Sequence, residues 1–445
     1  MTQLRSDNEL ASEAVSMNDP TSLLFGLDSF VVLDVGRVED QVVQVVIESR
    51  SREAGCPGCG VLTSRVKERP LVALKDVSAS GQRVRLWWRK RRLVCGERAC
   101  EVRSFTQADP AIPPRSRLTA RLRQHLAMAV AGSNRAVEEV AREHGVSWPT
   151  VHRAHVAAAA RWLPPPEPTP VLGIDETRAR SVRWVLEPSG WKRSNPWLTS
   201  FVDVDPSRAG LLLGLALGRS GACVKDWLAE QTPQFRAAVQ VVVIDPSAPY
   251  ASGVRAALPH AAITVDKWHL VRLGNDMVTD VRQRVARERH GRRGMVIDPA
   301  WAHRRMLLTA GDRLSKRQLA RLKRVLASDD PTNEIGAAWG CTELVRQLLD
   351  APAEPGEIRH RLWRFYDACA TADMPETTRL ATTIATWWPA ILVAIETGTT
   401  NARTEGYNRL IKQTKRVACG FRNMDNYQRR ILTHIAVTRQ REQAA

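Results

Sequence analysis

The chain has 445 residues, and its 65 lysines and arginines outnumber its 47 acidic residues to give a formal net charge of +18. This length exceeds a single compact core, so we expect roughly two to four domains, and the charge favours a polyanionic partner, either nucleic acid or an anionic membrane surface. No apolar run approaches the roughly 20 residues that cross a bilayer, and residues 1–20 lack the apolar segment of a signal peptide, so we expect a cytoplasmic protein whose cysteines stay reduced.

The first predicted domain is a small β module, residues 29–112, that follows a polar leader at residues 1–28. Residues 29–49 alternate between apolar and polar side chains, which predicts a β-hairpin. Two cysteine pairs come next, with the spacing of a structural zinc site that has four thiolate ligands. Thiols without a metal are the main alternative, and disulfides are a weaker one. The four predicted zinc ligands are Cys56, Cys59, Cys95 and Cys100.

A basic strand is predicted between the two cysteine pairs. The sequence RVRLWWRKRRLVC, residues 83–95, alternates in a way that gives one packing face and one charged face. We expect the charged face to contact DNA phosphates, which would set affinity and salt dependence rather than sequence choice. An ordinary solvated face is the alternative. The predicted phosphate contacts are Arg83, Arg85, Arg89, Lys90, Arg91 and Arg92.

Residues 113–163 are predicted to form a helix-turn-helix DNA-binding domain. Gly145 permits the turn, Ser147 can cap the following helix, and Pro149 falls in its first turn. A DNA-binding domain of this kind places the first residues of its last helix in the major groove. A generic helical hairpin is the alternative. The predicted DNA-contacting residues of this helix are Trp148, Thr150, His152 and Arg153.

A proline-rich linker, residues 164–170, precedes a predicted α/β core. Its segments VLGIDET, VRWVLEP and WLTSFVDV are strand-like and follow one another in hairpin order, and helical and strand-like segments then alternate through VQVVVID. This order predicts a mixed sheet with helices on both faces. An all-α insertion separates the two parts of the core. We assign the core to residues 171–268 and 396–445, and the insertion to residues 269–395.

Three acidic residues, far apart in the sequence, are the predicted catalytic site. Asp175 lies on the first core strand, Asp245 ends a later strand, and Glu405 lies on a later helix. This order is that of the ribonuclease H-like fold, and the ends of strands are where an open α/β sheet builds its site. Cleavage of a phosphodiester requires an activated water or 3′-hydroxyl, which two Mg²⁺ or Mn²⁺ ions provide. We expect Asp175 to bridge both ions and the other two acids to hold one each; for Asp175 alone, capping a turn is the alternative.

The helix that carries Glu405 has a polar face. Asn401, Glu405, Asn408 and Lys412 recur at helical spacing, which suits a metal ion beside a phosphate. The basic residues at the end of this helix are predicted DNA contacts, and ordinary solvated charge is the alternative. These residues are Lys412, Lys415 and Arg416.

The chain resembles transposases of the bacterial ISL3 insertion-sequence family over nearly its whole length. The resemblance is carried by the four cysteines, the helix-turn-helix, GIDE around Asp175, VIDPSAPY around Asp245, and TNARTEGYNRLIK with ACGFRNMDNYQRRI. It implies that the catalytic triad is Asp175, Asp245 and Glu405. A (Cys/Asp)-x-x-His motif further implies that Asp266 and His269 position the cut strand. Purely structural roles, as a strand-end acid and a helix-start histidine, are the alternative for these two.

The sequence therefore predicts a DNA transposase that binds the terminal inverted repeats of its own element and, with Mg²⁺ or Mn²⁺, cleaves the DNA and transfers the freed strand to target DNA. Two DNA ends must be held together, which implies at least a dimer. A zinc and helix-turn-helix transcription regulator without catalysis is the alternative. A structure-specific nuclease without strand transfer is a weaker one.

Overall fold

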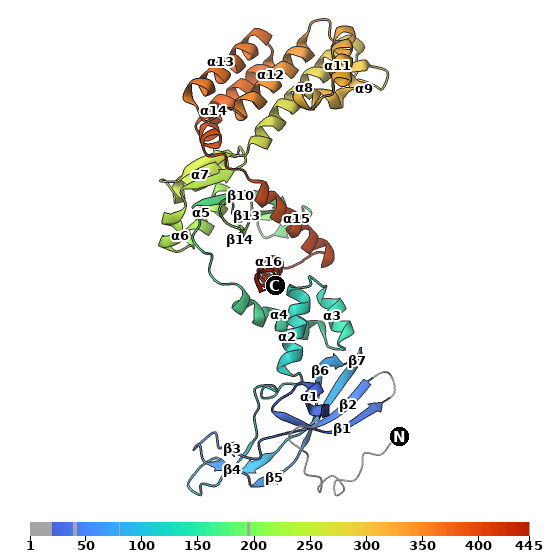
Figure 1. The fold of residues 1–445 in the computed structure, drawn as a ribbon, viewed down its shortest axis with the longest axis vertical. Coiled ribbons are helices and arrows are strands. Elements are labelled where there is room, and N and C mark those ends of the chain that lie inside the picture. The colour runs from blue at the N-terminus through green and yellow to red at the C-terminus, as the bar shows by residue number, and fades with distance from the viewer. Residues whose placement is uncertain (1–19, 39–41, 80, 194–195, 445) are drawn as a thin grey trace. The chain divides into compact units, whose positions relative to one another are not determined.

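The structure is a computed structural model that describes residues 20–38, 42–79, 81–193 and 196–444 (Figure 1). Its contacts divide the chain into two compact units. Unit 1 comprises Met1–Pro164, Val417–Cys419 and Asp425–Ala445, and unit 2 comprises Pro165–Arg416 and Gly420–Met424. Most of the predicted polar leader, residues 1–19, lies outside the described residues, and its last part contains a short helix, α1 (Pro20–Phe25).

Unit 1 begins with a four-stranded sheet in the order β1-β2-β7-β6. The predicted hairpin is confirmed, because β1 and β2 pair antiparallel. The predicted alternation in β7 is also confirmed: Val84, Leu86 and Trp88 are buried on one face, and the Trp88 ring packs edge-on against Phe30. The strands are β1 (Phe30–Val38), β2 (Val42–Ser49), β6 (Leu71–Ala79) and β7 (Gln82–Arg89).

Five short strands lie near the cysteines in the sequence, and they form a two-stranded and a three-stranded sheet. Leu93 and Phe105 pack with Cys56 and Cys95 in a small core of their own. Such a core buries little apolar surface, so a module of this size would gain stability from a bound metal. The strands are β3 (Ala54–Gly55), β4 (Leu62–Thr63), β5 (Val66–Glu68), β8 (Arg92–Val94) and β9 (Ser104–Thr106).

Three helices of unit 1 form the helix-turn-helix: α2 (Ala120–Ala131), α3 (Val137–Glu143) and α4 (Trp148–Trp162). Gly145 has a φ of +59°, a conformation that glycine adopts without strain, and so makes the predicted turn. Ser147 stands at the N-cap of α4, but its hydroxyl pairs with the Thr150 hydroxyl instead of capping the backbone.

A fifth described helix of unit 1 comes from the end of the chain. The sequence prediction placed residues 396–445 together in the catalytic core, whereas the contacts of Asp425–Ala445 group α16 (Met424–Ala444) with unit 1. Arg430 donates to the Arg135 carbonyl, and His434 Nδ1 lies 2.7 Å from the Ala131 carbonyl oxygen. The helix packs in unit 1 because its side chains form hydrogen bonds with carbonyl groups at the turn between α2 and α3.

Unit 2 is built on a five-stranded sheet in the order β14-β13-β10-β15-β16. β10 pairs antiparallel with β13 and parallel with β15, and β16 continues the parallel part. Leu172 and Ile174 of β10 are fully buried in the core. The strands are β10 (Val171–Arg178), β13 (Trp197–Asp203), β14 (Leu212–Leu217), β15 (Val241–Ile244) and β16 (Ala262–Val265). The helices packed with them are α5 (Gly221–Ala229), α6 (Pro233–Ala238) and α7 (Ala248–Ala257).

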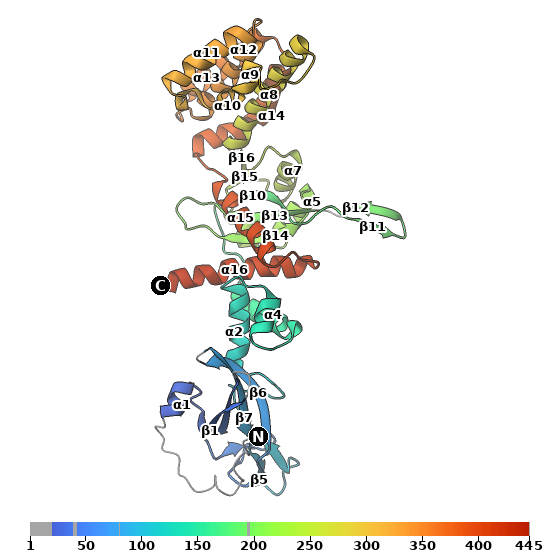
Figure 2. The same ribbon diagram turned by 90° about the vertical axis from the view of Figure 1, so that its right-hand side faces the viewer.

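The segment VRWVLEP does not join this sheet, contrary to the sequence prediction. It forms β11 (Trp184–Glu187), which pairs only with β12 (Gly190–Arg193) in a separate hairpin. Figure 2 shows this hairpin extending away from the sheet. The antiparallel partner of β10 is β13 instead. The seven residues of β13 are almost entirely buried, as a strand inside the sheet requires, whereas those of β11 are almost entirely exposed.

The predicted helical insertion lies between β16 and α15 (Ala402–Val417). Among the described helices, α14 alone is long and apolar enough to cross a bilayer by length and composition. Its Leu380, Ile384 and Ile391 are buried in the helical core, so this is weak support for a membrane span. The helices are α8 (Lys267–His290), α9 (Pro299–Ala302), α10 (Arg304–Leu307), a 3₁₀ turn (Gly311–Arg313), α11 (Lys316–Asp329), α12 (Glu334–Leu349), α13 (Pro355–Ala372) and α14 (Pro375–Thr397).

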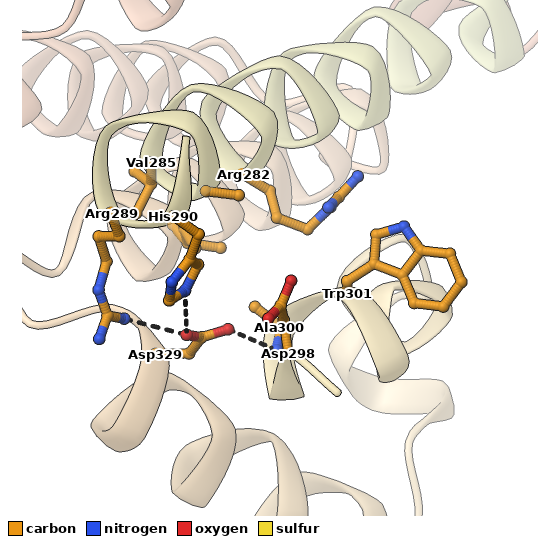
Figure 3. Close-up of a pocket in the computed structure, with 10 residues that line it drawn as sticks. Arg282, Val285, Arg289, His290, Asp298, Ala300, Trp301 and Asp329 are labelled. Atoms are coloured by element: carbon orange, nitrogen blue, oxygen red, sulfur yellow. Dashed lines mark hydrogen bonds and ion pairs between the residues drawn. The ribbon is translucent and has the colours of Figure 1, made fainter. Parts of the chain in front are cut away.

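A polar network links α8, α9 and α11 (Figure 3). Asp329 Oδ1 pairs with Arg289 at 3.0 Å, and its Oδ2 accepts from the backbone N–H of Ala300 at 2.9 Å. The cavity among these residues measures about 10 Å³, which is room for about one water. The network therefore joins helices and offers no space for a substrate.

Candidate functional site

Two of the predicted catalytic acids lie on neighbouring parallel strands. Asp175 is on β10, and Asp245 directly follows the last residue of β15. Gly173 of β10 pairs with Val243 of β15, so both aspartates come two residues after a paired position and reach the same edge of the sheet. Both are partly buried, whereas Glu405, in the first turn of α15, is exposed.

The helix α15 packs against the face of β10 that carries Asp175. Asn408 Nδ2 donates to Asp175 Oδ2 at 2.7 Å, and Asn401 Nδ2 donates to the Ile174 carbonyl at 3.3 Å. A Cβ atom at Gly173 would lie 2.6 Å from Thr404 Oγ1. This approach explains the glycine two residues before the aspartate, since any side chain there would push the helix away.

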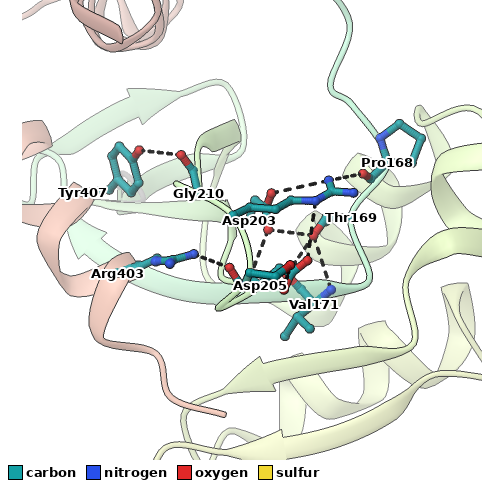
Figure 4. Close-up of polar contacts among 10 residues, drawn as sticks. Pro168, Thr169, Val171, Asp203, Asp205, Gly210, Arg403 and Tyr407 are labelled. Atoms are coloured by element: carbon teal, nitrogen blue, oxygen red, sulfur yellow. Dashed lines mark hydrogen bonds and ion pairs between the residues drawn. The ribbon is translucent and has the colours of Figure 1, made fainter. Parts of the chain in front are cut away.

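The other side of α15 is anchored to the loop between β13 and β14 (Figure 4). Arg403 donates to the Asp205 carbonyl, and the Tyr407 hydroxyl donates to the Gly210 carbonyl at 3.4 Å. The loop is itself fixed where the Thr169 hydroxyl donates to Asp203 at 2.8 Å. Glu405 therefore belongs to a helix turn held from both sides.

The acidic side chains of this site repel one another. Burial, together with the nearby carboxylates of Asp175, Glu176, Asp266 and Glu405, raises the pKa of Asp245 to about 8. Such a cluster of negative charge is a setting that a divalent cation would stabilise.

Asp175 shows the same effect in weaker form. Burial raises its pKa to about 6, with a contribution from Glu176 and Glu405. The Glu176 backbone N–H and the Asn408 amide oppose the shift by donating hydrogen bonds to the carboxylate. Two donors thus fix the orientation of Asp175 while leaving much of its charge uncompensated.

The donor set fits Mg²⁺, which prefers carboxylate oxygens. Asp245 Oδ1 is buried and has no hydrogen-bond partner among the described residues, although His269 Nε2 lies 3.1 Å away. Within residues 20–38, 42–79, 81–193 and 196–444, only the four cysteines form a group of three or more metal ligands with all ligand atoms within 4.8 Å. The ligand atoms of the three acids are therefore not all within 4.8 Å of one another.

Asp266 and His269 have different surroundings. Asp266 is buried at the N-cap of α8, where its carboxylate accepts from the Trp268 backbone N–H at 3.0 Å. This is the structural role that the sequence left open for it. His269 is half-buried beside Asp245, and burial lowers its pKa.

The four cysteines meet as a metal site requires. The Cys56 and Cys100 sulfurs are 3.8 Å apart, and those of Cys59 and Cys95 are 3.5 Å apart. A zinc–sulfur bond of about 2.3 Å places the sulfurs of a tetrahedral site roughly 3.8 Å from one another. The arrangement therefore fits structural zinc.

Two of the six basic residues predicted to contact phosphates have partners inside unit 1. Arg83 donates to the carbonyls of Arg142 and Glu143 at the end of α3. Arg91 is buried, pairs with Glu48 at 2.9 Å and donates to backbone carbonyls. These partners favour an internal role for both residues, although Arg83 is exposed, so neither is among the phosphate contacts proposed below.

The other four basic residues of this set reach the surface to different degrees. Arg85 is exposed, and Arg89 is partly exposed. Lys90 lies over the Trp88 ring at 4.6 Å, and Arg92 pairs with Glu68 at 2.9 Å. All four remain candidates for phosphate contact.

The start of α4 presents the predicted DNA-contacting side chains. Trp148 is exposed and stacks on His152, with ring centroids 4.8 Å apart. Arg153 is exposed, with its Nε donating to the Pro149 carbonyl, and Thr150 is partly exposed. On α15, Lys412 and Arg416 are exposed and Lys415 is partly exposed.

Sequence reasoning missed several residues around the acids. Glu176 follows Asp175 directly and contributes charge to both aspartates. Ser200 of β13 donates to Asn408 Oδ1 at 3.2 Å and so supports the amide that holds Asp175. The glycine in GIDE was a usable signal for Gly173, because a glycine inside a strand marks a close approach by another segment.

Comparison with known proteins gives three matches to family models. A transposase family of the ISL3 type matches residues 172–431, the helix-turn-helix domain of transposase family ISL3 matches residues 109–155, and the zinc finger of the IS204/IS1001/IS1096/IS1165 transposases matches residues 52–100. The transposase for insertion sequence element IS1001 from Bordetella parapertussis is 23% identical over 397 residues, which cover 87% of this chain and 90% of that protein. The chain belongs to the ISL3 family of DNA transposases.

Proposed function

We propose that this transposase cleaves and joins DNA at the sheet edge where Asp175, Asp245 and Glu405 gather. The observation that carries the proposal is the geometry of the edge: Gly173 pairs with Val243, so Asp175 and Asp245 reach it together, and the Asn408 amide ties the helix of Glu405 to Asp175. The sheet order β14-β13-β10-β15-β16 supports a ribonuclease H-like core, because the antiparallel strands lie on one side of β10 and the parallel ones on the other. A regulator without catalysis has no need of carboxylates that destabilise one another.

In this proposal Asp175, Asp245 and Glu405 are the residues that would hold two Mg²⁺ or Mn²⁺ ions. Two such ions, when bound, activate the attacking water or 3′-hydroxyl and neutralise charge on the leaving oxygen. Asn408 keeps the Asp175 carboxylate in one orientation through its 2.7 Å hydrogen bond. His269, whose pKa is lowered by burial, lies beside Asp245 and is suited to positioning the DNA strand there.

Unit 1 would bind the terminal inverted repeats. Side chains at the start of α4 read base edges in the major groove, and basic residues of the zinc module and of α15 contact phosphates. This division means that the zinc module and α15 set affinity and α4 sets sequence choice. The proposed base-reading residues are Trp148, Thr150, His152 and Arg153. The proposed phosphate contacts are Arg85, Arg89, Lys90, Arg92, Lys412, Lys415 and Arg416.

The reaction also implies an assembly. Two element ends must be cut and joined together, so we propose at least two subunits on the DNA, in the cytoplasm where the chromosome lies. A twofold arrangement is the simplest closed form in which two identical chains can hold two repeated ends.

The test compares Glu405→Gln with Glu396→Gln, an exposed glutamate of α14. We expect E405Q to lose Mg²⁺-dependent nicking of DNA that carries the element's ends, because its amide is a poor Mg²⁺ ligand, while binding that DNA normally. E396Q should nick like the wild type. Normal nicking by E405Q would remove Glu405 from the site, and absence of metal-dependent nicking in the wild type would favour the regulator.

A further inference from the structure

The hairpin formed by β11 and β12 carries an exposed apolar face. The exposed fractions are 61% for Trp184, 65% for Leu186 and 67% for Trp191. The register pairs Leu186 with Trp191 and Trp184 with Arg193, and residues opposite one another share a face, as do residues two apart in one strand. Trp184, Leu186, Trp191 and Arg193 therefore line one side of the hairpin.

This hairpin lacks the support that such strands usually have. In the part of the chain that the structure describes, no third strand joins it. An isolated two-stranded hairpin is marginally stable in water, and each large aromatic side chain offers roughly 150–250 Å² to a partner. The exposed tryptophans are therefore available to bind a partner.

The charge of the surrounding segment indicates the kind of partner. The basic residues of positions 178–193 are Arg178, Arg180, Arg183, Lys192 and Arg193, and the acidic one is Glu187. Lys192 pairs with Glu187 at 3.5 Å on the exposed surface, where such an ion pair is weak. Flat aromatic rings beside an excess of basic side chains match single-stranded nucleic acid, which offers both phosphates and base faces.

The hairpin joins the sheet near the catalytic acids. It leaves the sheet after β10, which carries Asp175, and returns to β13, with Arg178 and Trp197 paired at its base. Asp175 is three residues from that base, or about 10 Å along the strand, and Trp184 is six residues beyond the base. Figure 2 shows the hairpin at the end of an arm that extends from the sheet, so DNA that runs on from the acids along this arm would reach the hairpin.

We propose that the β11–β12 hairpin is a further DNA-binding site, in which Trp184 and Trp191 stack on unpaired bases beside the cleaved position and Lys192 and Arg193 contact the neighbouring phosphates. Cleavage leaves strand ends that can unstack, and every base has a face on which a ring can stack, so this contact does not depend on sequence. The proposal rests on the proposed function, since it assigns the unpaired DNA to the same catalytic edge.

The experiment uses the full chain and two probes, a duplex with a short unpaired gap and the same duplex without the gap. The gap contains 2-aminopurine, whose fluorescence falls when a ring stacks on it. We expect Trp184→Ala and Trp191→Ala each to weaken binding of the gapped duplex about tenfold and to abolish the fluorescence change. Phe at either position should restore most of the binding and most of the fluorescence change, because it keeps an aromatic ring.

The matched control is Trp363→Ala, at a tryptophan of α13 that is 62% exposed. It should behave like the wild type with both probes. Wild-type binding and fluorescence change in W184A and W191A would overturn the proposal, as would subunit dissociation of these variants in sedimentation with unchanged DNA binding. Either result leaves the E405Q nicking test untouched, so the two proposals fail separately.

Discussion

Gly173 and Asp175 lie on one face of β10, and that face is covered by α15. The helix approaches so closely that Thr404 Oγ1 and Asn401 Oδ1 would lie 2.6 and 2.7 Å from a Cβ at Gly173. The same packing lets Asn408 hold the Asp175 carboxylate. The distance between β10 and α15 therefore sets the distance between Asp175 and Glu405.

We expect Gly173→Ala to lower the cleavage rate by about a hundredfold, because a displacement of the order of 1 Å at a catalytic group has this effect. It should also lower the free energy of unfolding by about 1–3 kcal/mol, the usual cost of overpacking. Cleavage of end-bearing DNA and thermal melting measure the two effects. The control is Gly406→Ala on α15, where a Cβ meets open space. A wild-type cleavage rate in G173A would show that the spacing has no catalytic role.

At the scale of single elements, α16 is the helix with the least expected position. Its Thr433 hydroxyl donates to the Arg429 carbonyl and lies 2.8 Å from His155 Nε2 of α4. Burial, together with the charges of Arg430, His152 and Arg429, lowers the pKa of His155 to about 3. The environment of His155 between α4 and α16 therefore favours its neutral form.

This contact predicts that acid loosens unit 1. A histidine with a folded-state pKa below its unfolded value of about 6.5 destabilises the fold as the pH falls below that value, because only the unfolded chain takes up the proton. Between pH 7.5 and pH 5 the loss amounts to about 2 kcal/mol. Denaturant unfolding at several pH values should show this loss in the wild type and a smaller one in His155→Gln, whose amide can still donate to Thr433. Equal pH dependence in both proteins would contradict the assignment.

At the scale of the whole molecule, the sequence predicted the features that depend on neighbouring residues. The alternation of Val84, Leu86 and Trp88 and the turn at Gly145 follow from local pattern and were confirmed. Partners far along the chain could not be predicted in this way. The alternation in VRWVLEP is the same whether or not a third strand joins it, and the apolar spacing of α16 does not say which unit covers it.

In the candidate site, too, local pattern predicted some residues, whereas contacts with distant segments could not be predicted. The strand-end acids could be chosen from the sequence because a charged residue after a buried β-branched run is unusual. The internal roles of Arg83 and Arg91 could not be, because their partners are backbone carbonyls, which every segment of the chain possesses. The catalytic assignment of Asp175, Asp245 and Glu405 remains a prediction that cleavage experiments must test.

The most direct test is Mg²⁺-dependent cleavage of end-bearing DNA by Asp175→Asn, with exposed Asp226→Asn of α5 as the matched control. If Asp175 holds the catalytic ions, loss of its carboxylate removes several kcal/mol of transition-state stabilisation, so D175N should cleave about a thousandfold more slowly or worse while binding the DNA as the wild type does. D226N should cleave normally. Cleavage by D175N at the wild-type rate would contradict the account.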